Sequence, residues 1–94
     1  MKLYNTNFHP KGPTKAATFE IKSGKVFTTP DHPEGADPEP WYEVREGKLY
    51  PTPTHPQRAS VDSPWYEIRA GKVYSASGHP HGAQAFPFFE LREN

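Results

Sequence analysis

The sequence WYEVREGKLY, residues 41–50, decides the fold of this chain. Its aromatic, β-branched and long charged side chains favour strands on both sides of Glu46-Gly47. Two such runs joined by a short Gly-containing link predict a β-hairpin. A two-residue loop would place Val44 opposite Leu49, whereas a three-residue loop with a bulge is the alternative register. We favour the first, because it pairs aliphatic residues with each other.

The same pattern recurs four times and fills nearly the whole chain. The copies cover residues 2–24, 25–47, 48–71 and 72–94, so that their lengths are 23, 23, 24 and 23 residues. The first copy is the least faithful, with Thr18 where the others have Trp41, Trp65 and Phe88. A repeat of this length is typical of a unit that buries its apolar face only against its neighbours. We therefore predict one domain made of four repeats.

Equivalent turns predict how the repeats close on each other. Three hairpins span the repeat boundaries and leave one strand at each end of the chain without a partner. By the repeat pattern, Arg92-Glu93-Asn94 would lead directly into Lys2-Leu3-Tyr4. The sequence thus predicts an all-β fold in which four hairpins form a closed pseudo-fourfold ring with paired N- and C-terminal strands. An open solenoid of stacked hairpins is the alternative.

Composition limits the core and argues against helices. Only 33% of the residues are hydrophobic. The chain has 12 prolines, which recur in the stretches between the predicted strands and argue against helices there. The expected core contains most of the aromatic residues together with eight aliphatic ones. The aliphatic residues are Leu3, Ile21, Val26, Val44, Leu49, Ile68, Val73 and Leu91. Such a core makes the monomer marginally stable, and we expect a homo-oligomer that covers exposed aromatic faces.

Charge is balanced overall but unevenly distributed. The net charge is zero, and eight of the 11 basic residues border the hairpin turns. We interpret them as a salt-bridge lattice with the repeated glutamates Glu20, Glu43, Glu67 and Glu90 rather than as an anion-binding rim. The balance also argues against nucleic acid as a partner. Four further acidic residues are expected to belong to a solvated loop: Asp31, Glu34, Asp37 and Glu39.

Histidine gives the first candidate site. His9, His32, His55 and His79 occupy the same place in the four copies, each before a proline, and fourfold symmetry would arrange them in a ring. Imidazole is a common ligand of transition metals, so the ring could hold one. Alternatively, each imidazole bonds the backbone of its own His-Pro loop, and we favour this interpretation, which requires no cofactor. His81 is expected to be an ordinary exposed side chain.

Aromatic residues give the second candidate site. Alternation places Trp41, Trp65 and Phe88 on the strand face that carries Glu20, Glu43, Glu67 and Glu90. Aromatic walls with a carboxylate can enclose a sugar or a cation. In WYEVREGKLY and WYEIRAGKVY the chain resembles choline-binding and related cell-wall-binding hairpin repeats.

Catalytic signals are weak. The chain has no cysteine, none of its serines lies in a nucleophile-elbow pattern, and no Gly-rich phosphate loop is present. Residues 1–5 lack an apolar run, so we expect neither a signal peptide nor a membrane partner and place the protein in the cytoplasm.

A resemblance covers nearly the whole chain. Through WYEVREGKLY, WYEIRAGKVY, HPEG and HPHG it is similar to small bacterial proteins of unknown function with flower-like fourfold β-hairpin repeats. That resemblance implies the architecture and a bacterial source. We predict a non-enzymatic module for binding or assembly, with a His-ring metal protein and an aromatic-cage binder as the alternatives.

Overall fold

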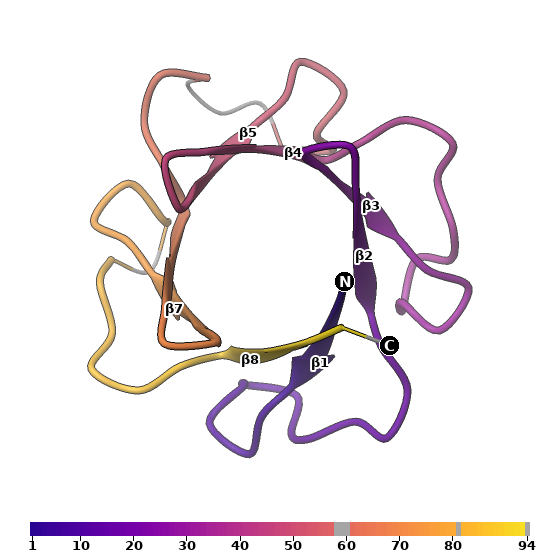
Figure 1. Ribbon diagram of the computed structural model, residues 1–94, viewed down its shortest axis with the longest axis vertical. Coiled ribbons are helices and arrows are strands. Elements are labelled where there is room, and N and C mark those ends of the chain that lie inside the picture. Colours follow the sequence, from indigo (N-terminus) through magenta and orange to yellow (C-terminus); the bar gives the residue numbers. More distant parts are fainter. Residues whose placement is uncertain (58–60, 81, 94) are drawn as a thin grey trace.

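Eight short antiparallel strands form a closed barrel in the computed structural model, which describes residues 1–57, 61–80 and 82–93 (Figure 1). The strands follow chain order around the ring: β1 (Lys2–Asn5), β2 (Phe19–Lys22), β3 (Lys25–Thr28), β4 (Tyr42–Arg45), β5 (Lys48–Pro51), β6 (Tyr66–Arg69), β7 (Lys72–Ser75) and β8 (Phe89–Arg92). No helix occurs in these ranges. The flattened molecule measures 31 × 31 × 22 Å.

Closure is achieved by the two ends of the chain. Strand β1 pairs with β8, with Lys2 opposite Arg92 and Leu3 opposite Leu91, and the two strands lie next to each other in Figure 1. The prediction of a closed ring with paired terminal strands is confirmed, and the solenoid alternative is wrong. Since a closed barrel leaves no strand edge unpaired, the fold avoids the edges at which sheets aggregate. Asn94, predicted to complete this junction, lies outside the described residues.

The three continuous hairpins adopt the two-residue register. Ile21 lies opposite Val26, Val44 opposite Leu49 and Ile68 opposite Val73. Both turn residues have positive φ, with 52° at Ser23, Glu46 and Ala70 and 75° to 77° at the following glycines. Two consecutive positive φ angles define the primed turn that matches the twist of a hairpin. The three-residue alternative is therefore wrong.

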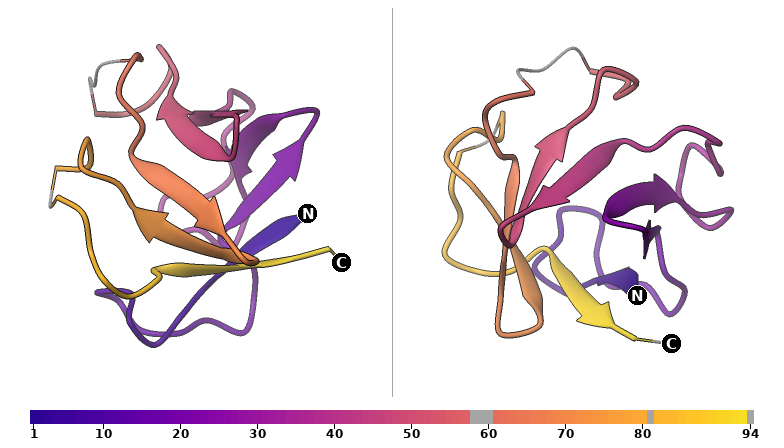
Figure 2. Two further views of the ribbon diagram at one scale, coloured as in Figure 1. Left: turned by 60° about the vertical axis from the view of Figure 1, so that its left-hand side comes forward. Right: turned by 45° about the horizontal axis from the view of Figure 1, so that its top comes forward.

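Successive hairpins are joined by a shorter second pairing. Leu3 lies opposite Phe19, Val26 opposite Tyr42, Leu49 opposite Tyr66 and Val73 opposite Phe89. The long loops between these strands extend outward around the ring (Figures 1 and 2). Threonine hydroxyls connect neighbouring loops. Each donates a hydrogen bond to a backbone carbonyl that lies two residues before β8, β2 or β4: Thr6 to Pro87, Thr29 to Ala17 and Thr52 to Pro40.

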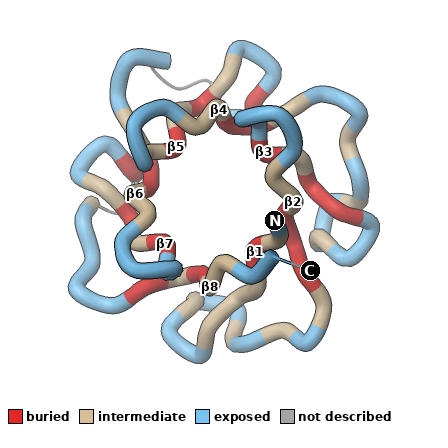
Figure 3. Tube along the Cα trace, viewed as in Figure 1, coloured by how far each residue is buried: buried red, intermediate tan, exposed pale blue. Residues whose placement is uncertain are grey.

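The barrel interior is filled by layers of equivalent residues. Leu3, Val26, Leu49 and Val73 are at most 1% exposed, whereas the other four predicted aliphatic core residues are only partly buried. A second layer consists of four aromatic rings in edge-to-face contact with centroids 5.5 to 6.0 Å apart: Phe19, Tyr42, Tyr66 and Phe89. Buried residues follow the strands, and the projecting loops are largely exposed (Figure 3). The aromatic layer forms the floor of the site described below.

The outer face carries the predicted charge lattice. Like charges face each other next to every turn, as with Arg45 and Lys48. Three arginines bond the glutamate two residues earlier on the same strand, with Arg92 and Glu90 2.8 Å apart, and each also covers a tyrosine ring. Hydrogen bonding to Arg92 holds the pKa of Glu90 below its usual value. Three of the four repeated glutamates, Glu43, Glu67 and Glu90, therefore form the predicted ion pairs and compensate the like charges that face each other on the barrel surface.

Candidate functional site

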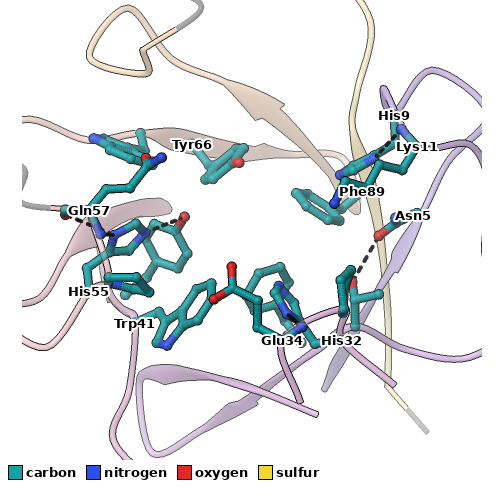
Figure 4. Close-up of a pocket in the computed structure, with 16 residues that line it drawn as sticks. Asn5, His9, Lys11, His32, Glu34, Trp41, His55, Gln57, Tyr66 and Phe89 are labelled. Carbon is teal, nitrogen blue, oxygen red and sulfur yellow. Dashed lines mark hydrogen bonds between the residues drawn. The ribbon is translucent and has the colours of Figure 1, made fainter. Parts of the chain in front are cut away.

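A pocket of about 240 Å³ lies where the His-Pro loops meet the barrel (Figure 4). Its floor is the layer formed by Phe19, Tyr42, Tyr66 and Phe89. The walls contain three of the repeated histidines and both tryptophans of the chain: His9, His32, His55, Trp41 and Trp65. The volume is below the range of about 300–1,000 Å³ typical of drug-sized ligands, so the pocket suits a smaller molecule.

Each histidine of the pocket wall is fixed by its own loop. The Nδ1 atoms of His9, His32 and His55 accept hydrogen bonds from the backbone amides of Lys11, Glu34 and Gln57 at 3.0 to 3.1 Å. The same loops return through a Gly amide that donates to the histidine carbonyl, at Gly12 and Gly35. The loop-backbone role expected for the histidines is confirmed at these three positions. At His9 and His32 Nδ1 is only an acceptor, so the proton of each neutral ring is on Nε2. Nδ1 of His55 also lies 3.1 Å from the carbonyl oxygen of Gln57, to which the other tautomer would donate.

Histidines and aromatic residues alternate around the wall. Trp41 lies between His32 and His55, with ring centroids 4.8 and 5.4 Å away. The same relation recurs for Trp65 between His55 and His79, and for Phe88 between His79 and His9. Thr18 occupies the equivalent place between His9 and His32 and contributes no ring. The alternation is therefore interrupted at one of its four positions.

Two tyrosine hydroxyls extend the histidine network across the floor. Nε2 of His55 lies 3.0 Å from the Tyr42 hydroxyl, and Nε2 of His79 lies 3.2 Å from the Tyr66 hydroxyl. Burial raises the pKa of Tyr66 to about 12, against a hydrogen bond with Tyr42 that lowers it. Burial also raises the pKa of Tyr42, and the electrostatic interaction and hydrogen bond with Tyr66 raise it further. Both phenols therefore stay protonated near neutral pH.

Burial also lowers the pKa of three histidines. Desolvation is the main cause at His9, His32 and His55, and the Lys11 charge adds to it at His9 and His32. The Glu34 charge opposes the shift at His32 and His55. The wall is consequently built from neutral imidazoles at pH 7 and above.

These shifts predict a loss of stability in mild acid. The unfolded imidazoles take up protons near their ordinary pKa of 6.5, whereas the folded ones resist protonation until lower pH. The unfolded state then binds more protons than the folded state. The contribution of these histidines to the free energy of unfolding is therefore fully present above pH 6.5 and decreases as the pH falls below it. We expect a lower urea midpoint at pH 5.5 than at pH 7.5. His32→Asn should reduce this pH dependence, and equal midpoints for the unmodified protein would contradict the assignment.

Several of the residues that differ among the four copies line the pocket. Lys11, Glu34 and Gln57 stand directly after the His-Pro pair in successive copies, and all three line the mouth. Asn5 and Thr18 line one side, where Thr18 donates to the Asn5 side-chain oxygen at 2.9 Å. The other copies have Thr28, Pro51 and Ser75 in place of Asn5. A symmetric framework thus encloses an asymmetric pocket.

The structure brings together only part of the predicted sites. All four repeated histidines belong to one ring, but aromatic side chains or Thr18 separate them. Within residues 1–57, 61–80 and 82–93, no three His, Cys, Asp or Glu side chains are grouped so that they could hold a metal ion. His81 lies outside the described residues.

The predicted aromatic and acidic groups are separated from each other. Trp41 and Trp65 are buried beside histidines, each just before a strand, and Phe88 contacts His9 and His79. The repeated glutamates lie on the outer face of the barrel, opposite an aromatic residue of the next strand: Glu20, Glu43, Glu67 and Glu90. The carboxylate that accompanies the tryptophans in the pocket is instead Glu34, assigned from sequence to a solvated loop (Figure 4).

Comparison with known proteins adds no family assignment. No family model matches the chain, and no match was found among the curated proteins or the solved structures. The described residues contain no helix long and apolar enough to cross a membrane.

Proposed function

We propose that this protein is a non-enzymatic binding module that holds a small molecule in its axial pocket. The observation that carries the proposal is that the lining of the pocket departs from the symmetry of the repeats. Residues that build the barrel are nearly the same in every copy, whereas Asn5, Lys11, Thr18, Glu34 and Gln57 break the pattern and all line the pocket. Folding alone requires none of these differences, since the other copies fold with different residues at the same places.

The histidines support a binding role over a catalytic one. Three of them use Nδ1 to fix their loops, and His55 and His79 use Nε2 on tyrosine hydroxyls. A general base would need a free nitrogen with a pKa near the working pH, whereas burial lowers the pKa of the three wall histidines that show a shift. These contacts make the histidines rigid parts of a preformed wall.

Filling the gap in the wall tests the proposal. Thr18→Trp introduces the side chain that the second and third copies already have at this place, so the barrel should tolerate it while the pocket loses volume. We expect fragments from a small-molecule library, screened by ¹⁵N NMR, to shift amide signals of the pocket in the unmodified protein and not in T18W. These signals are the amides on either side of the three loop prolines: His9, Lys11, His32, Glu34, His55 and Gln57. Lys15→Trp, in an exposed part of the first loop, is the matched control and should retain binding.

The same screen defines the contrary result. Fragments that shift only amides outside the pocket, or that bind T18W as well as the unmodified protein, would refute a ligand site on the axis. Zinc and nickel ions belong in the screen, because a stoichiometric complex that is lost in His9→Phe and His32→Phe would favour the metal alternative.

A further inference from the structure

Two of the four histidines present a donor where the pocket floor lacks a hydroxyl. His32 lies 4.9 Å from Phe19 with an interplanar angle of 67°, matching His55 and Tyr42 at 4.9 Å and 66°. His9 lies 5.2 Å from Phe89 at 62°, matching His79 and Tyr66 at 5.1 Å and 65°. In the tyrosine pairs Nε2 bonds the hydroxyl. The equal geometry therefore directs Nε2 of His9 and His32 to the places that tyrosine oxygens would occupy.

The same side of the pocket has lost the aromatic side chain that separates the other histidines. Thr18 stands there, is 3% exposed and uses its hydroxyl to bond Oδ1 of Asn5. The side-chain oxygen of Asn5 therefore accepts a hydrogen bond within the protein. The Nδ2 group of Asn5 makes no hydrogen bond to another residue of the described ranges and is available as a donor in the pocket. Two neutral ring donors and one amide donor thus share the space beside Thr18, where the other copies have an aromatic side chain.

Lys11 adds a positive charge at the mouth of this space. It lines the pocket, and its charge lowers the pKa of both His9 and His32. Among the described residues its ammonium group forms no salt bridge. The polar groups available on this side, Nε2 of His9 and His32, Nδ2 of Asn5 and the ammonium group of Lys11, are hydrogen-bond donors. The ligand group that complements them is therefore an acceptor with negative charge.

We infer that the axial pocket binds a small monocarboxylate with an apolar body. Its oxygens accept from Nε2 of His9 and His32 and from the amide of Asn5, with Lys11 balancing the charge, and its apolar part lies toward Trp41 and Trp65. This inference rests on the proposed binding function and specifies the ligand class.

Charge and shape favour a carboxylate over phosphate. The wall histidines whose pKa is lowered are neutral at pH 7.5, so Lys11 is the positive group of this side, and Glu34 brings a negative charge to the same mouth. With Lys11 and Glu34 at the same mouth, a dianion would carry one more uncompensated negative charge than a monoanion. The opposite side is formed by the two indoles and the floor rings. It favours contact with apolar surface over contact with the remaining oxygens of a phosphate.

Four probes of related shape test this ligand class at pH 7.5. Benzoate, benzamide, benzylammonium and inorganic phosphate are titrated against the full chain, with the fluorescence of Trp41 and Trp65 and calorimetry as readouts. Benzoate should bind at least about tenfold more tightly than the uncharged amide, as expected for a charge-assisted hydrogen bond of about 1.5–3 kcal/mol. Equal or tighter binding of benzamide, benzylammonium or phosphate would overturn the inference.

Substitutions that restore the repeat pattern provide the sharpest variants. Phe19→Tyr with Phe89→Tyr supplies the missing hydroxyls to His32 and His9, so the barrel should keep its stability while benzoate affinity falls at least about tenfold. Phe27→Tyr is the matched control, because it lies on the outer face where the other copies have Tyr4, Tyr50 and Tyr74. Unchanged benzoate affinity in the double variant would refute the assigned donors.

The lysine is tested by a second pair. Lys11→Met should weaken benzoate binding about tenfold and leave benzamide unaffected, whereas Lys15→Met, in an exposed part of the same loop, should change neither. Equal loss for both ligands would show that Lys11 only supports the loop. If no carboxylate binds but other fragments do so and are lost in T18W, the carboxylate inference fails while the binding function stands; if no fragment reaches the pocket, both fail.

Discussion

Replacing Leu49 with alanine is expected to remove most of the stability of the barrel. Leu49 is 1% exposed, lies between Val44 and Tyr66 in the two ladders of its strand, and belongs to the most deeply buried layer. Leu→Ala at such positions costs about 2–5 kcal/mol through lost burial and a residual cavity. Domains are stable by only about 5–15 kcal/mol, and one this small lies toward the lower end.

Urea unfolding followed by tryptophan fluorescence measures this loss. The control is Val61→Ala, since Val61 is 40% exposed and should cost at most about 0.5 kcal/mol. A loss of less than about 1 kcal/mol for Leu49→Ala would mean that the axial layers do not form the core.

Joining the two ends of the chain is expected to stabilise the protein by a similar amount. In the other hairpins two residues separate the paired basic residues, as Glu46-Gly47 separates Arg45 from Lys48. Arg92 already lies opposite Lys2, so linking residue 94 directly to Lys2 after removal of Met1 supplies a turn of the same length. Asn94→Gly would match Gly47. Closing a ring of this size lowers the entropy of the unfolded chain by an amount worth about 4.5 kcal/mol.

The linear protein with the same N94G change and without Met1 is the control for cyclisation. Both forms should show the same near-UV spectrum, and the cyclic form should unfold at markedly higher urea concentration. The stacked rings of Phe8 and Phe86, 4.6 Å apart, already hold the first and last loops together, so closure should require no rearrangement. A cyclic form no more stable than the linear one would indicate strain at the new turn.

Sequence patterns predicted the barrel well because they repeat. Aliphatic residues opposite each other across Gly-containing turns set the register, and the identical register at every boundary required the terminal strands to meet. The positive φ of Ser23, Glu46 and Ala70 could not be expected from their types, since such residues rarely adopt it. Pairing of the flanking strands outweighs this local cost.

The pocket was harder to predict because its walls come from loops. Strict alternation assigned Trp41 to the face of Glu43, but Trp41 precedes the strand and is buried by His32 and His55. The repeat pattern also indicates candidate sites only at positions that are alike in every copy, whereas the residues that line one side of the pocket occur in a single copy. The usable signal was the first copy's loss of an aromatic residue at Thr18, which opens the histidine ring.

The division between a repeated frame and single-copy lining residues has a consequence for how such a molecule changes over time. The positions after the His-Pro pair, represented by Lys11, Glu34 and Gln57, are exposed and contribute to no strand ladder. A substitution at any one of them alters one quadrant of the pocket lining and leaves the barrel layers intact. Under the proposed binding function, ligand preference can therefore change one quadrant at a time while the barrel core stays the same.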